Sequence, residues 1–300
     1  MESNVTQHDG FNLIVIGDRI NPGFKAVKVL VDNNDFAGIQ ALAVRQVEAG
    51  ASYLDITIGP RAAHDSVFMA DTIRAIQAVT TIPPCFDFPT AAVQSLCLKT
   101  YDRARAGGAL PLINSITEHR WDIMDLYEPL GPFKVIVMVS ERVENGVAKP
   151  NKTADEIIST AKRAALRLQA DYGMPMDDIF IDISISAVVA DTTGLHRATL
   201  DAIRMIRRDP DLRGIHIMGG LTNIGGQLPS KAVDGSDLKL ALECAFLTLA
   251  VPLGLDAVLA TPWRLLRPLS DDNYVLTAYK NFLEQSGSNA LRAVRKFYRA

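Results

Sequence analysis

Short apolar runs recur along this chain, and six of them break on an aspartate or an asparagine. Between these runs, apolar residues follow the spacing of an amphipathic helix. Strands that alternate with helices in this way are typical of a parallel sheet whose outer face is covered by helices. The polar residues at which the runs break are Asp18, Asn21, Asp55, Asp87, Asn114, Asp182 and Asn223.

Eight strand-then-helix units can be assigned in chain order. The predicted strands cover residues 13–18, 53–58, 85–88, 110–115, 134–140, 179–184, 214–221 and 256–260. The predicted helices cover residues 35–49, 65–79, 89–106, 118–130, 153–172, 195–208, 236–251 and 272–284. Eight such units predict a (β/α)8 TIM barrel, a fold that takes ~250 residues. Residues 286–300 are predicted to form a short amphipathic helix that packs on the barrel or on a second subunit.

An open, doubly wound sheet is the competing α/β fold. It normally carries a glycine-rich phosphate-binding turn after its first strand. Here the residues GDRIN stand in that place, at positions 17–21, so the barrel is favoured. No linker-like or low-complexity stretch interrupts the chain, which predicts a single domain over residues 1–300.

Composition narrows the class of function. The net charge of −3 argues against nucleic acid as the main partner, because phosphate binding favours a basic surface. No run approaches the ~18 apolar residues of a membrane span. The polar N-terminus lacks the pattern of a signal peptide, so a cytoplasmic protein is predicted. The cysteines Cys85, Cys97 and Cys244 are too widely spaced for a zinc or disulfide pattern, and no metal site is predicted.

Four of the polar residues fall at or near the carboxyl ends of predicted strands, and in a barrel these ends meet in one pocket. They are Asp87, Asn114, Asp182 and Asn223. A carboxylate accepts hydrogen bonds from ring N–H groups, and a carboxamide offers both a donor and an acceptor. The set therefore predicts recognition of a flat heterocycle rather than of a metal ion.

The motifs around these residues resemble those of the pterin-binding methyltransferases, barrels that transfer a methyl group between a tetrahydrofolate and a corrinoid. The likeness covers nearly the whole chain, and the order and spacing of the motifs make it specific. The matching segments are GDRIN at 17–21 (GERIN in the family), LDITIGP at 54–60 (LDLNVGP), LINS at 112–115 (INS), GLTNI at 220–224 (GLSNV), LPSK at 228–231 (LPxR) and GLDA at 254–257 (GLDA).

The resemblance implies roles for single residues. Asp87, Asn114 and Asp182 would contact the pterin ring, and Asn223 would be the active-site amide that approaches N5 of the pterin. The residues given supporting roles are Asp18, Asn21, Asp55 and Lys231. An amide can hydrogen-bond both protonated and unprotonated N5, so a strong acid beside N5 is not required. Asp18 and Lys231 depart from the family, where a glutamate and an arginine are usual.

The same resemblance implies substrates and partners. Tetrahydrofolate and 5-methyltetrahydrofolate would be the folate substrates. The corrinoid would arrive on a separate protein, because the D-x-H-x-x-G signature of a cobalamin module is absent from this sequence. The loop at 141–152 is a candidate docking or lid element for that protein. Related barrels form homodimers, so a homodimer is expected.

We expect a methyltransferase that moves the methyl group from methyl-corrinoid to tetrahydrofolate, in a demethylation pathway. One alternative is a methyltetrahydrofolate:corrinoid/iron–sulfur protein methyltransferase, which works in the opposite direction. Another is a non-catalytic folate-binding barrel. A third is a dihydropteroate synthase-like enzyme. That enzyme needs a basic cluster after the seventh strand, where this chain has GGLTN at 219–223.

Overall fold

A computed structural model describes residues 6–8 and 10–299, so most of the N-terminal segment inspected for a signal peptide lies outside the described residues. Eight parallel strands form a closed barrel, in which β2 pairs with both β11 and β3. The strands are β2 (Phe11–Ile20), β3 (Tyr53–Ile56), β4 (Pro84–Asp87), β5 (Leu112–Ile116), β6 (Lys134–Met138), β9 (Ile179–Asp182), β10 (His216–Gly220) and β11 (Ala257–Ala260). The (β/α)8 barrel predicted from the sequence is confirmed.

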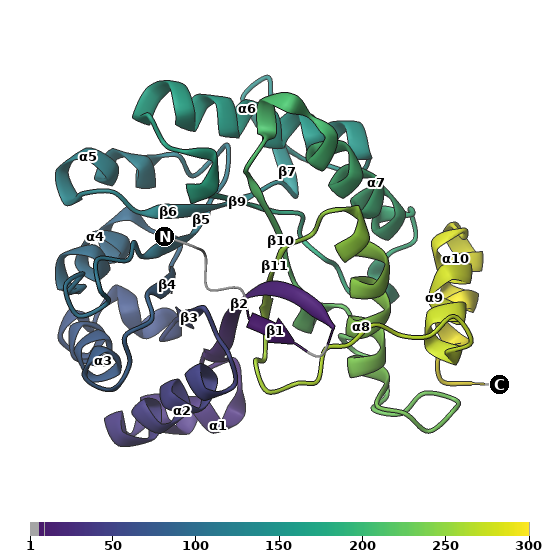
Figure 1. Ribbon diagram of the computed structural model, residues 1–300, viewed down its shortest axis with the longest axis horizontal. Helices are drawn as coiled ribbons and strands as arrows, with labels where there is room; N and C mark the ends of the chain where they lie inside the picture. The colour runs from purple at the N-terminus through teal and green to yellow at the C-terminus, as the bar shows by residue number, and fades with distance from the viewer. Residues whose placement is uncertain (1–5, 9, 300) are drawn as a thin grey trace.

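Helices surround the ring of strands on the outside (Figure 1). They are α1 (Lys25–Asp32), α2 (Phe36–Glu48), α3 (Ser66–Val79), α4 (Ala91–Thr100), α5 (Tyr127–Leu130), α6 (Ala154–Tyr172), α7 (Leu195–Arg208), α8 (Leu238–Ala250), α9 (Tyr274–Leu283) and α10 (Gly287–Arg295). No helix within residues 6–8 and 10–299 is long and apolar enough to cross a membrane.

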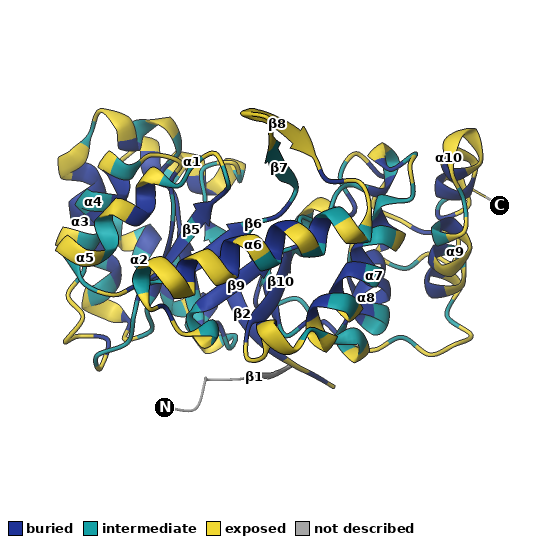
Figure 2. Ribbon diagram, turned by 90° about the horizontal axis from the view of Figure 1, so that it is seen from above, coloured by how far each residue is buried: buried dark blue, intermediate teal, exposed yellow. Residues whose placement is uncertain are grey.

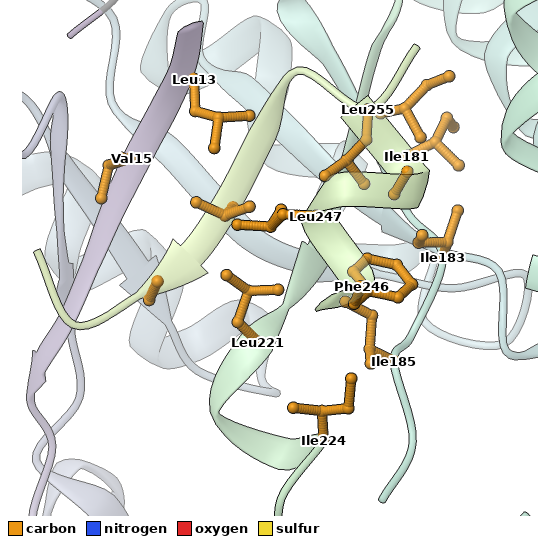
Figure 3. Close-up of a cluster of buried hydrophobic side chains, with 14 of the residues drawn as sticks. Leu13, Val15, Ile181, Ile183, Ile185, Leu221, Ile224, Phe246, Leu247 and Leu255 are labelled. Atoms are coloured by element: carbon orange, nitrogen blue, oxygen red, sulfur yellow. The ribbon is translucent and has the colours of Figure 1, made fainter. Parts of the chain in front are cut away.

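Two separate apolar layers hold the barrel together, because alternate residues of a strand face opposite sides. On β2, Ile14 and Ile16 belong to a small cluster inside the barrel, whereas Leu13 and Val15 face the helices. The other members of the inner cluster are Cys85, Leu112, Ile136, Phe180, Met218 and Ala257. In the outer layer, Phe246 of the strongly apolar helix α8 lies among side chains of β9 and of the segment after it (Figure 3).

Several predicted helix boundaries are confirmed. Helix α6 begins after Thr153 with a capping box to Glu156 and ends at Gly173, whose φ of 62° suits glycine. Helix α8 begins later than expected. Asp237 is the cap, since its side chain accepts from the N–H of Leu240. Ser236 instead hydrogen-bonds Asp234.

Two predicted helices are shorter than expected. The helix predicted for 89–106 ends at Thr100, and the Asp102 carboxylate then accepts from Ala104 N–H and holds a turn. The helix predicted for 118–130 is replaced by the 3-10 helix η2 (Asp122–Leu126) and the single turn α5. Here the Thr117 hydroxyl accepts from the N–H groups of His119 and Arg120 and competes with a helical start.

The prediction of a loop over residues 141–152 is wrong, because most of this segment forms a β-hairpin of β7 (Glu141–Glu144) and β8 (Val147–Pro150). Its turn is Asn145–Gly146, with φ values of 53° and 77°, which is the pair that a tight two-residue hairpin favours. The hairpin projects on the opposite side of the barrel from β1 (Thr6–His8) (Figure 2). It therefore stands over the carboxyl-terminal end of the barrel.

The C-terminal segment forms the amphipathic helix expected from the sequence. Helix α10 buries Ala290, Ala293 and Val294, and Phe297 follows as a fully buried side chain. It packs against α9 of the same chain, at the edge of the molecule (Figure 1).

Candidate active site

A layer of polar side chains lies above the apolar cluster inside the barrel. On each strand, the residue two positions beyond a lumen-facing apolar side chain points to the same side. Asp18 follows Ile16 in this way, and Asp87 follows Cys85. The full layer, in barrel order, is Asp18, Asp55, Asp87, Asn114, Met138, Asp182 and Gly220, with Thr261 just beyond β11. Strand alternation therefore brings five of the polar residues selected from the sequence into one layer of the barrel, namely Asp18, Asp55, Asp87, Asn114 and Asp182.

The register of the strands fixes which of these residues are neighbours. Asp87 of β4 pairs with Asn114 of β5, and Asp182 of β9 lies between Met138 and Met218. Asn114 Nδ2 donates to Asp55 Oδ1 at 3.3 Å. The predicted ring contacts Asp87, Asn114 and Asp182 thus line one wall, with Asp55 beneath it.

Burial changes the acidity of these carboxyls. Asp55 is only 1% exposed. Its burial raises its pKa well above the usual range, and repulsion from Asp87 is the second cause. Burial also raises the pKa of Asp87 to about 6, against a lowering influence from Arg120. The Asp182 pKa is raised to about 6 by burial, although the Ser184 N–H donates to Asp182 Oδ1 at 2.8 Å.

Three residues at this wall were not predicted as site residues from the sequence. Arg120 Nη2 donates to Ser115 Oγ at 3.1 Å and lies 3.6 Å from the sulfur of Met138. Ser115 follows Asn114 through a cis peptide bond. Period-two alternation from Ile136 could have identified Met138. Arg120 lies in a loop, where no periodic signal identifies a side chain that folds back over a strand end.

Asn223 lies at the rim of the barrel mouth rather than in the buried layer. It ends the 3-10 helix η6 (Leu221–Asn223), which follows β10 directly, and its residue is exposed. Its carbonyl accepts from Gly226 N–H at 2.9 Å. The segment after β9 supports this turn, because Val188 N–H donates to the carbonyl of Ile224.

The remaining predicted residues have different surroundings. The Asn21 Oδ1 accepts from Gly23 N–H and holds a local turn. Lys231 is exposed and forms a backbone bridge with Asp237, and no contact described for it reaches the polar layer. Asp18 is buried within the layer and accepts from Thr261 Oγ1 at 3.1 Å. Geometry thus groups Asp18 and Asp55 with the predicted ring contacts, and leaves Asn21 and Lys231 apart.

A polar layer of this kind, open at the carboxyl end of a barrel, is where TIM-barrel enzymes bind their substrates. Residues 28–260 of the chain match a family model described as "Pterin binding enzyme". This chain belongs to the pterin-binding enzyme family. The family resemblance and the enzyme class predicted from the sequence are confirmed.

Relatives of the pterin-binding enzyme agree with this family. A methylcorrinoid:tetrahydrofolate methyltransferase from Eubacterium limosum is 24% identical over 262 residues, which cover 83% of this chain and 85% of the relative. Dihydropteroate synthase from Xanthomonas albilineans, solved with 4-aminobenzoic acid, has a TM-score of 0.55 at 17% identity, covering 91% and 93% of the two chains. The Burkholderia cenocepacia dihydropteroate synthase complexed with 7,8-dihydropteroate has a TM-score of 0.52 at 19% identity, covering 95% and 93%. These solved structures share the fold.

Proposed function

We propose that this pterin-binding enzyme transfers a methyl group between a protein-bound corrinoid and N5 of tetrahydrofolate, chiefly from methyl-corrinoid to tetrahydrofolate. The observation that carries the proposal is the half-buried wall of Asp87, Asn114 and Asp182, which offers acceptors and an amide to the edge of a flat ring. A 2-amino-4-oxo pterin edge presents matching N–H donors. The sequence relative whose name states this reaction supports the choice of chemistry.

In this proposal the ring contacts bind and orient the folate, and Asn223 at the rim hydrogen-bonds N5. The rim is also the side from which a second substrate can approach. Holding the methyl group in line between its donor and N5 would supply much of the rate acceleration, because fixed orientation replaces a costly encounter. The amide of Asn223 can serve N5 in both of its protonation states.

The proposal includes a corrinoid-carrying protein as partner, since the chain lacks a cobalamin signature. The β7–β8 hairpin is its candidate docking element, because the hairpin stands over the barrel mouth (Figure 2). Its first strand is anchored to the barrel, with Val143 N–H donating to Glu118 and Arg163 paired with the same carboxylate. A homodimer, a cytoplasmic location and a single domain over residues 1–300 complete the proposal.

Mixing the purified protein with a methylated corrinoid protein and tetrahydrofolate tests the function. We expect the absorption spectrum of reduced corrinoid to appear and 5-methyltetrahydrofolate to form. A second arm starts from 5-methyltetrahydrofolate and reduced corrinoid protein and measures the opposite direction. Folate binding without a spectral change in either arm would mean a non-catalytic binding barrel. In a separate assay with a dihydropterin pyrophosphate and 4-aminobenzoate, synthesis of dihydropteroate would instead assign the dihydropteroate synthase reaction.

A further inference from the structure

Asp18 is a buried carboxyl of the polar layer. It has no role in the contacts proposed for the pterin ring. Its residue is 5% exposed. Asp18 Oδ1 accepts from Thr261 at 3.1 Å, and the nearby Thr222 side chain acts to lower the pKa of the carboxyl. Oδ2 has no hydrogen-bond partner among residues 6–8 and 10–299. It is the one carboxylate oxygen of that described part of the chain that is both fully buried and unpartnered, and such an atom is costly in a folded protein.

The position of Asp18 relates it to both parts of the site. Thr222, whose side chain is near enough to influence the pKa of Asp18, directly precedes Asn223 in η6. On the other side, Asp18 is close enough to Asp55 for their charges to interact. Because β2 lies between β11 and β3 in the barrel, Asp18 occupies the stretch of wall between the rim amide and the buried acids.

The chemistry of the proposed reaction needs a proton acceptor. When N5 of tetrahydrofolate takes the methyl group, the N5–C bond forms and the C–Co bond breaks, with its electron pair remaining on cobalt. N5 then carries both a hydrogen and a methyl group, and its N–H proton must leave while the electron pair stays on nitrogen. The amide of Asn223 can hydrogen-bond N5 in either state, but an amide does not take up a proton near neutral pH.

We propose that Asp18 Oδ2 accepts this proton, and that protonated Asp18 returns it to N5 in the opposite direction. This inference rests on the proposed function. The charged groups that face Asp18 are Arg19 on the same strand, Asp55 on β3 and Glu243 on α8. Burial raises the pKa of Asp18, against the lowering effects of the hydrogen bond from Thr261 and the charge of Arg19. A carboxyl whose affinity for protons is raised toward neutral pH is better matched to proton transfer.

The pH dependence of the rate in both directions, measured at saturating folate, tests the proposal. For the wild-type enzyme, methylation of tetrahydrofolate should speed up with rising pH, because the acceptor must be ionised. Demethylation of 5-methyltetrahydrofolate should slow down over the same range. Asp18→Asn keeps the shape and removes the acceptor, and we expect both rates to fall roughly 100-fold and both slopes to vanish. The dissociation constant for tetrahydrofolate should stay within about three-fold, since the ring contacts are intact.

Two further variants serve as controls for the pH dependence. Asp18→Glu retains a carboxyl and should retain both slopes. Glu243→Gln removes the other buried carboxyl near Asp18, which Arg264 holds at 2.8 Å, and should leave both slopes unchanged. Wild-type rates that do not vary with pH would overturn the proposal even if Asp18→Asn fails to fold. So would slopes that persist in Asp18→Asn or disappear in Glu243→Gln. A wild-type protein that transfers no methyl group refutes the proposed function itself, whereas wild-type transfer with an equally active Asp18→Asn refutes the Asp18 role alone.

Discussion

At the scale of single residues, four carboxyls lie in the polar layer of the barrel, with Asp18 and Asp55 buried and Asp87 and Asp182 half-buried. Burial raises the pKa of each, which means that ionisation is unfavourable in the folded protein. Because the folded pKa lies above the unfolded one, these groups favour folding at low pH, and Asp87 and Asp182 lose that contribution as pH rises through about 6. A barrel under selection for stability alone would fill this level with apolar side chains, so the cost points to ligand binding.

Folate affinity is expected to fall as the pH is lowered through 6. Asp87 and Asp182 each have a pKa of about 6, and a protonated carboxyl loses an acceptor for a ring N–H group. From pH 7 to pH 5, the loss should be roughly ten-fold for each carboxyl that must be ionised. Fluorescence titration with tetrahydrofolate at several pH values measures it.

Asp182→Asn is the matched variant, since its Oδ1 can still accept from Ser184 N–H. It should bind folate about ten-fold more weakly at pH 7 and show a flatter pH dependence. Asp177→Asn is the control, because Asp177 is 69% exposed and lies before β9, at the other end of the barrel. An affinity that is independent of pH in the wild-type protein would contradict the assigned role.

Asn223→Ala should lower the methyl-transfer rate much more than it weakens folate binding. The exposed amide at the rim contributes little to holding the ring, but it is proposed to hydrogen-bond N5 as charge changes there. Loss of one such contact costs about 100-fold in rate. Stopped-flow corrin spectra give the transfer rate, and folate titration gives the affinity. Transfer at the wild-type rate would refute the assignment of Asn223.

Residues on strands were easier to predict than residues in loops. Asp87, Asn114 and Asp182 could be located because strand alternation and the common end of the barrel fix where their side chains point. Arg120 could not, since its approach to Ser115 depends on the path of the loop between them. Asn21 and Lys231 were selected by motif alone, and their described contacts are local.

At the scale of elements, the segment between β9 and α7 connects the two parts of the site. It begins at Asp182, contacts Ile224 next to Asn223 and is held from behind by α9. His196 Nε2 lies 3.0 Å from the carbonyl of Ser186, and its Nδ1 lies 2.7 Å from Tyr279 Oη. Because a carbonyl only accepts, Nε2 must donate to Ser186, and the Tyr279 hydroxyl then donates to Nδ1.

Tyr279→Phe should loosen this support. The variant keeps the fully buried ring and removes one buried hydrogen bond, which costs about 1 kcal/mol and lowers the melting temperature by ~2 °C. Folate affinity should fall by a few-fold, because Asp182 is held less firmly. Tyr274→Phe is a control, since its hydroxyl bonds the carbonyl of Lys296 at the surface. Unchanged folate affinity in Tyr279→Phe would mean that α9 does not support the folate site.

Elements with strong local signals were predicted well. Helix α7 has the bounds expected from its spacing, and α6 has its capping box. Elements decided by competing local hydrogen bonds were not, as in the turns after Thr117 and Thr100. The Asn145–Gly146 turn was a readable hairpin signal that the polar composition of the segment obscured.

At the scale of the whole molecule, five of the exposed aliphatic side chains follow barrel strands in the sequence. They come from different connections after the strands and are Val29, Val67, Val147, Val233 and Leu265. Val147, at the turn of the hairpin, is 60% exposed. Scattered single residues of this kind are ordinary on a surface, but Val147 at the tip of a projecting hairpin is well placed for contact with a protein partner.

Val147→Asp should therefore slow methyl transfer with a protein-bound corrinoid and leave transfer with free cobalamin unchanged. A charge at the centre of an apolar contact costs about 1–3 kcal/mol, so the Michaelis constant for the corrinoid protein should rise about ten-fold. Val79→Asp is the matched control, because this valine is 42% exposed at the end of α3, on the opposite face. Steady-state rates with the two forms of corrinoid distinguish the outcomes. Equal losses with both forms would mean that Val147 supports the folate site, and no loss with either would place the docking surface away from the hairpin.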